Sequence, residues 1–113
     1  MLQANTLKLN TEFHRVYAKG KSCASPVLVT YALRNKNSCC RKGITTSKKI
    51  GSAVERNRCR RVIRAAFASL SEEIEGNWDL VFVARYKTKT VKSTEVETAM
   101  REQLVKLGVI VKN

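Results

Sequence analysis

Cationic side chains crowd one stretch of this chain. Between residues 48 and 64, seven Lys and Arg side chains stand against a single carboxylate, that of Glu55. Guanidinium and ammonium groups at this density suit phosphate oxygens, and without a polyanion they would repel one another. The stretch therefore predicts nucleic-acid binding. The alternative is a solvated helix with ordinary surface arginines, which we favour less because too few acids are present to pair them.

Side chains for phosphodiester hydrolysis are scarce. His14 is the only histidine, Asp79 is the only aspartate, and the eight glutamates are mostly scattered over predicted helix surfaces. The sequence has no carboxylate cluster of the two-metal type and no Ser/His/Asp or Cys/His signature, so we do not expect a stand-alone nuclease. No C-x-x-C pair occurs either, so we predict no metal site and free thiols at Cys23, Cys39, Cys40 and Cys59.

The positive charge extends over the whole chain. Of its 113 residues, 22 are Lys or Arg and 9 are Asp or Glu, which gives a net charge of +13. The length suits a single domain, residues 1–113, and the charge predicts a polyanionic partner. The sequence contains no apolar run of about twenty residues and no signal-peptide pattern, so we expect a cytoplasmic protein with no membrane partner.

A long helix must carry most of these cations. Gly51 supplies a turn and Ser52 an N-cap, so the spacing predicts a helix from Ser52 to Ile74 or Glu75. Its apolar face recurs at three- and four-residue steps and consists of Cys59, Ile63, Ala66, Phe67, Leu70 and Ile74. At roughly 100° per residue, one flank of that face holds Ala53, Asn57, Arg60, Arg61 and Arg64.

The remaining elements complete an α/β pattern. A short helix is predicted over Thr11–Lys19, with Asn10 as N-cap and a left-handed Gly20 at its end. Residues 22–26 are predicted to be a connector, and the next two segments, Val27–Leu33 and Cys40–Lys48, are predicted to be the strands of an antiparallel hairpin. After the long helix we expect a strand at Trp78–Arg85, a basic loop at Tyr86–Lys92 and a last helix from Ser93 or Thr94 to Leu107. This order predicts an α+β two-layer sandwich, with three helices on a mostly antiparallel four-stranded sheet.

The basic stretch also carries a family resemblance. The run Ser47-Lys48-Lys49-Ile50-Gly51-Ser52-Ala53-Val54, followed by Arg56-Asn57-Arg58 and Arg60-Arg61-x-x-Arg64, resembles the signature of the bacterial ribonuclease P protein subunit. The earlier pattern Phe-x-x-Val-Tyr-x-x-Gly matches that family's first helix. The resemblance extends from roughly Leu7 to Leu107, and it implies a left-handed crossover between the strands on either side of the long helix.

The resemblance implies an enzyme whose active site is RNA. Ribonuclease P hydrolyses precursor tRNA to remove its 5′ leader, and its RNA subunit holds the magnesium ions, so the protein is expected to have no catalytic residue, metal or cofactor of its own. The implied partners are ribonuclease P RNA and precursor tRNA, in a 1:1 ribonucleoprotein without DNA. The residues implied to meet the catalytic RNA are Lys48, Lys49, Arg56, Asn57, Arg58, Arg60, Arg61 and Arg64.

A second implied surface is the cleft that takes the single-stranded leader. It resembles Phe13 and Tyr17 of the first helix with Val29, Tyr31 and Thr45 of the two strands. Aromatic faces stack unpaired bases without demanding a sequence, although the spacing of the aromatics alone fits core packing equally well. Composition would also fit a structural RNA-binding protein such as a ribosomal component, but the signature at residues 48–64 favours the ribonuclease P subunit.

Overall fold

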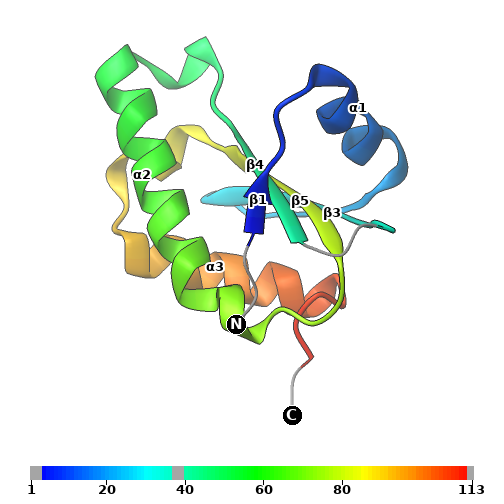
Figure 1. Cartoon of the computed structure of the whole chain (residues 1–113). Coiled ribbons are helices and arrows are strands. Elements are labelled where there is room, and N and C mark those ends of the chain that lie inside the picture. The colour runs from blue at the N-terminus through cyan, green and yellow to red at the C-terminus, as the bar shows by residue number, and fades with distance from the viewer. Residues whose placement is uncertain (1–3, 37–39, 112–113) are drawn as a thin grey trace.

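A five-stranded mixed sheet and three helices make up the computed structural model, which describes residues 4–36 and 40–111 (Figure 1). The strands are β1 (Ala4–Thr6), β2 (Lys21–Ala24), β3 (Leu28–Arg34), β4 (Cys40–Thr45) and β5 (Trp78–Ala84). The helices are α1 (Asn10–Lys19), α2 (Ala53–Leu70) and α3 (Ser93–Lys106), with 3-10 turns η1 (Lys48–Ile50), η2 (Ser71–Glu73) and η3 (Tyr86–Thr90). The predicted α+β fold is confirmed. Strands β2–β5 form the expected four-stranded sheet, with two of its three pairs antiparallel, and β1 adds a short parallel edge strand.

The predicted antiparallel hairpin of Val27–Leu33 with Cys40–Lys48, the segments that hold β3 and β4, is wrong. The strand order is β1-β4-β5-β3-β2, so β5 lies between β3 and β4, antiparallel to the first and parallel to the second. The reason is burial: six of the seven residues of β5 are buried, and only a central position covers such a strand on both sides. The β4–α2–β5 connection is the crossover for which a left hand is expected, and that hand stays a prediction.

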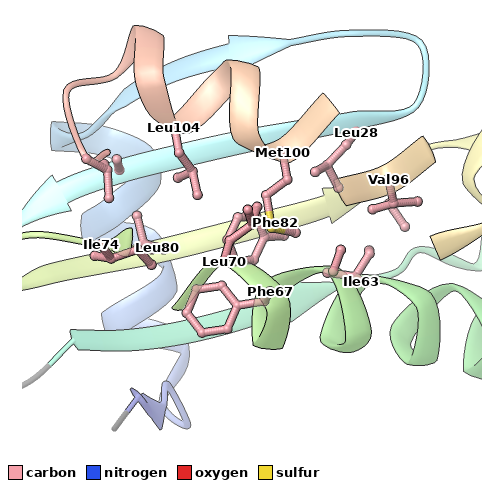
Figure 2. Close-up of a cluster of buried hydrophobic side chains, with 14 of the residues drawn as sticks. Leu28, Ile63, Phe67, Leu70, Ile74, Leu80, Phe82, Val96, Met100 and Leu104 are labelled. Atoms are coloured by element: carbon pink, nitrogen blue, oxygen red, sulfur yellow. The ribbon is translucent and has the colours of Figure 1, made fainter. Parts of the chain in front are cut away.

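The two faces of the sheet are covered unequally. Helices α2 and α3 pack on one face, where Phe67 of α2 meets Phe82 of β5 with ring centroids 5.5 Å apart. Figure 2 shows this core, with Met100 and Leu104 of α3 pointing into the same cluster. Of the described helices, only the ten-residue α1 covers the other face, and Val16 is its one buried residue. Part of that face therefore remains available for a ligand.

Several helix ends differ from the prediction. Ser52 caps α2 as expected, its hydroxyl accepting the amide of Glu55, but the helix ends at Leu70. Helix α1 starts at Asn10 rather than after it, because the Glu12 carboxylate accepts the amides of Lys8 and Leu9. Strand β2 occupies most of the segment predicted to be a connector, residues 22–26. The sequence gives no sign of this strand, because its mostly exposed residues show no apolar alternation.

Gly20 is needed for space rather than for a left-handed turn. Its φ is −78°, in the range of any residue. A Cβ there would lie 2.6 Å from the carbonyl oxygen of Val16 and 2.8 Å from that of Ala32. The glycine therefore allows the end of α1 to approach β3 closely.

A buried ion cluster joins α1 to the sheet. Asp79 of β5 is fully buried, and its carboxylate accepts Nε and Nη2 of Arg41 on β4 at 2.8 and 2.7 Å. Asn35, just after β3, donates to the same carboxylate at 2.7 Å. Nη1 of Arg41 reaches across to the Glu12 carboxylate of α1 at 2.6 Å. Sequence analysis found none of these contacts, because the partners lie 29 to 44 residues apart.

Replacing Arg41 should destabilise the fold strongly. Arg41→Ala leaves the buried Asp79 carboxylate with Asn35 as its side-chain donor among the described residues. We expect a loss of about 3 kcal/mol in the free energy of unfolding. The matched control is Arg101→Ala, which removes a two-bond pair with Glu73 on the surface, where both side chains are more than 40% exposed. Such surface pairs contribute little. Urea unfolding of the two variants compares them, and equal losses would contradict a special role for the buried cluster.

Candidate nucleic-acid interface

The start of α2 is a rigid, positively charged corner. Gly51 has φ +149°, and a Cβ there would overlap the Glu55 carboxylate that accepts the amide of Ser52. Nη1 of Arg56 donates to the carbonyl oxygen of Gly51 at 2.7 Å, so Arg56 braces the turn. Lys48 and Lys49 of η1 are exposed beside it. The free amides of the first helical turn add the positive end of the helix dipole, and together these groups form an anion-binding corner.

The cations of α2 do not share one flank. Arg60 and Arg64 lie on the flank that faces α1 and β4, and Nη1 of Arg60 donates to Oδ1 of Asn57 at 2.9 Å. Arg61 is exposed, farther from the core. Helical spacing places Arg58 on the opposite flank, where its Nη1 is buried without a hydrogen-bond partner among the described residues. Thus α2 presents two cationic flanks rather than one.

A groove runs between α1 and α2, and Figure 1 shows β4 passing between them. Its wider part has a volume of about 340 Å³ and is lined by Asn10, Phe13, His14, Tyr17, Ile44, Thr45, Thr46 and Arg60. A second hollow of about 200 Å³ shares Phe13, Ile44 and Arg60 and adds Thr6, Leu7, Lys42 and Arg64. The two hollows together form what we name the α1–α2 groove. It lies where the pairing of β1 with β4 ends, at Lys42.

The aromatic wall of the groove is fixed by packing. The hydroxyl groups of Tyr17 and Thr45 are hydrogen-bonded at 2.8 Å, and the rings of Tyr17 and Tyr31 meet edge to face with centroids 4.9 Å apart. Phe13 lies over Gly43, where a Cβ would come within 2.5 Å of two ring atoms. The wall therefore needs glycine at position 43.

The structure brings together three of the five residues expected in the leader cleft. Phe13, Tyr17 and Thr45 line the groove. Tyr31 packs beneath Tyr17 in a cluster with Leu7, Val16 and Val81, so it belongs partly to the core. Val29 lies on the same sheet face but one strand farther away, across Val83 from Thr45.

Sequence reasoning missed several groove residues. Asn10 and His14 follow from the α1 helical repeat once Phe13 and Tyr17 are placed on the groove side. Ile44 and Thr46 carry no such signal, because they reach the groove only around the open edge of β4. Arg60 was assigned to the basic helix end, whereas the structure also places it in the groove.

The acids near this surface are already engaged. Hydrogen bonds from the amides of Leu9 and Lys8, and the Arg41 guanidinium beyond them, hold the pKa of Glu12 below its ordinary value. The amide of Ser52 and the ammonium of Lys89 lower the pKa of Glu55. Both carboxylates therefore stay ionised at neutral pH and stay bound to these partners. Within the described residues, the groove cations Lys42, Arg60 and Arg64 form no ion pair, so their charge is available to a ligand.

The described cysteines, Cys23, Cys40 and Cys59, do not line the groove. Cys59 is buried in the core, as predicted, and burial raises the pKa of its thiol. Cys23 is a half-buried free thiol, Cys40 is buried in β4, and Cys39 lies outside the described residues. In the part of the chain that the structure describes, no three His, Cys, Asp or Glu side chains gather as metal ligands would. None of its helices is both long and apolar enough to span a membrane.

Fold and surface together define a small α/β protein that offers a cationic groove and a cationic helix end to a polyanion. The model of one protein family, described as Ribonuclease P, matches residues 1–108. The chain belongs to the ribonuclease P protein family, and its function is that of a ribonuclease P subunit in tRNA processing. The family membership predicted from the basic signature at residues 48–64 is thereby confirmed, in preference to the alternative of a ribosomal component.

Similar proteins agree with this assignment over nearly their whole length. The ribonuclease P protein component of Clostridioides difficile is 41% identical over 96 residues, 84% of each chain. That of Dehalococcoides mccartyi is 37% identical and covers 99% of this chain and 92% of its own. The solved RNase P protein of Staphylococcus aureus has a TM-score of 0.84 at 33% identity, covering 96% of this chain and 99% of its own. The solved RNase P protein of Thermotoga maritima has a TM-score of 0.73 at 28% identity, covering 91% of this chain and 94% of its own.

Gly43→Ala tests whether α1 packs on β4 through the contact of the Phe13 ring with Gly43. The added methyl group overlaps the Phe13 ring, so we expect a loss of about 1–3 kcal/mol in the free energy of unfolding. In a Phe13→Leu background the overlap disappears, and the same change should be neutral or slightly stabilising, because alanine costs less backbone entropy in a strand than glycine. Urea unfolding of the four proteins in this cycle gives the coupling. Equal effects of Gly43→Ala in both backgrounds would show that Phe13 does not rest on Gly43.

Proposed function

We propose that this chain binds two RNA molecules through two separate surfaces, each of which includes residues of α2. The α1–α2 groove takes the unpaired 5′ leader of precursor tRNA, and the exposed cations at the start and outer side of α2 hold the catalytic RNA. The RNA subunit, with its magnesium ions, then hydrolyses the phosphodiester bond. One protein binds one RNA subunit in the cytoplasm, and the protein raises the affinity of this ribonucleoprotein for precursor tRNA.

The single observation that carries this proposal is the composition of the groove. One wall presents Phe13 and Tyr17, and the other presents Arg60 and Arg64. Aromatic faces stack on bases, and guanidinium groups bind the phosphates between them. Stacking requires bases that are free of a duplex. A groove of this kind therefore suits a single strand of varying sequence, and the leader of precursor tRNA is one.

The side chains around the groove offer little for hydrolysis by the protein itself. His14 lines the groove without a carboxylate beside it among the lining residues. The carboxylate of Asp79, the only aspartate, is occupied by Arg41 and Asn35 below the surface. A general acid–base pair or a two-metal carboxylate site needs such groups side by side and accessible. This supports the assignment of the chemistry to the RNA subunit.

Reconstitution tests the division of labour. The purified protein should not cleave precursor tRNA, whereas the protein and ribonuclease P RNA together should cleave it at magnesium concentrations where the RNA alone is slow. The measurement is single-turnover cleavage of 5′-labelled precursor tRNA. Cleavage by the protein alone that survives controls for contaminating nucleases would contradict the proposal.

Arg60 and Arg61 form a matched pair for the two surfaces. They are neighbours with the same chemistry, but only Arg60 lines the groove. Arg60→Ala in the holoenzyme should reduce the preference for precursor tRNA over leaderless tRNA about tenfold, equivalent to about 1.4 kcal/mol. Arg61→Ala should leave that preference unchanged and instead weaken binding of ribonuclease P RNA, with a log–log salt slope lower by about one unit. Identical effects of the two substitutions on both measurements would refute the separation of surfaces.

A further inference from the structure

An exposed aromatic ring stands on the side of α2 away from the groove. Tyr86 is the first residue of η3, separated from the end of β5 by Arg85, and its relative exposure is 68%, more than that of Leu9 or Val111. The groove uses neither Tyr86 nor any other residue of η3. An exposed ring of this size is either incidental or available to a partner.

The ring is held in place by Lys89. The Lys89 ammonium lies 3.9 Å from the centroid of the Tyr86 ring. The same ammonium donates to the carbonyl oxygen of Ile50 at 2.9 Å and lies 3.3 Å from Oε2 of Glu55. The Lys89 side chain is only 13% exposed, so it is a fixed support rather than a mobile surface lysine. It ties η3 to η1 and to the first turn of α2.

The surroundings of the ring favour a polyanion. Lys87 is exposed beside it on η3, and Lys48 and Lys49 are exposed on η1, which packs against η3. Helical spacing puts Arg58 on the same flank of α2 as Glu55, where its half-buried guanidinium adds positive charge although its Nη1 is buried. Glu55, which lies at this corner, is bound to Lys89 and Ser52. A flat ring beside exposed cations is the combination by which proteins hold unpaired nucleotides.

We propose that Tyr86 is a stacking platform for an unpaired base of the catalytic RNA, with Lys48, Lys49 and Lys87 on the neighbouring phosphates. The inference rests on the proposed function and adds a specific contact to it. The occupant is the catalytic RNA rather than the leader, because Glu55 and Lys89 anchor η3 on the flank of α2 opposite Arg60 and Arg64. The support from Lys89 also means that the ring loses little freedom when a base stacks on it, which favours binding.

The test is the affinity of ribonuclease P RNA, without substrate, for variants at position 86. Tyr86→Ala and Tyr86→Leu should bind about 5- to 150-fold more weakly, the range for loss of one stacked base. Tyr86→Phe keeps the ring and should bind within about twofold of the wild type. None of the three should change the salt slope, because no charge is removed. Lys87→Ala is the matched control and should lower that slope by about one unit while the ring remains.

Each alternative result is decisive. Wild-type affinity in Tyr86→Ala would overturn the inference, and so would equal weakening by Phe, Ala and Leu, because the phenylalanine retains the stacking face. A defect that appears only with leader-bearing tRNA would assign the ring to the leader and overturn the proposed partner. Thermal unfolding of the variants checks that they fold, since so exposed a ring should contribute little to stability. If the wild-type protein itself fails to bind ribonuclease P RNA, it is the proposed function that fails.

Discussion

The buried pairing of Arg41 with Asp79 is the interaction on which the arrangement of the binding surfaces depends. It links β4 to β5 beneath α1, and the third guanidinium nitrogen reaches Glu12 on the helix. Without it, α1 would be held to the sheet mainly by Val16 and the half-buried aromatics. Because those aromatics also form the groove wall, the ion cluster helps to position a groove whose lining residues do not include Glu12, Arg41 or Asp79. A structural charge cluster thus serves the binding site indirectly.

Unequal cover of the two sheet faces explains why there is a groove at all. Helices α2 and α3 bury one face of the sheet, and among the described helices only the short α1 packs on the other face. The edge of β4 stays open beyond Lys42 because β1 is only three residues long. Arg60 and Arg64 overhang that open edge, whereas Tyr86 and Lys89 lie on the far flank of the same helix. This arrangement supports the proposed binding of two RNA segments, one on either side of α2.

Local features of the sequence were predictable, and the pairing of distant segments was not. The Ser52 cap, the apolar face of α2 and the strand that becomes β5 follow from residue types and their spacing. The insertion of β5 between β3 and β4 does not, since hairpin pairing of neighbouring segments is the default where a turn is short. Three of the five residues assigned to the leader cleft, Val29, Tyr31 and Thr45, lie on one sheet face, and the other two lie on α1, which covers that face. Tyr31 is partly structural because Tyr17 packs on it. The role of Arg60 in the groove depends on how close α2 lies to β4, which no local pattern contains.

The central claim is that the α1–α2 groove holds the leader. The most direct measurement is photo-crosslinking of a holoenzyme assembled on precursor tRNA that carries 4-thiouridine in the leader, with the crosslinked residues identified by mass spectrometry. The account predicts crosslinks to α1 and to the end of β4, at residues such as Phe13, Tyr17 and Ile44. Crosslinks confined to α3 or to η3, with none in the groove, would contradict it.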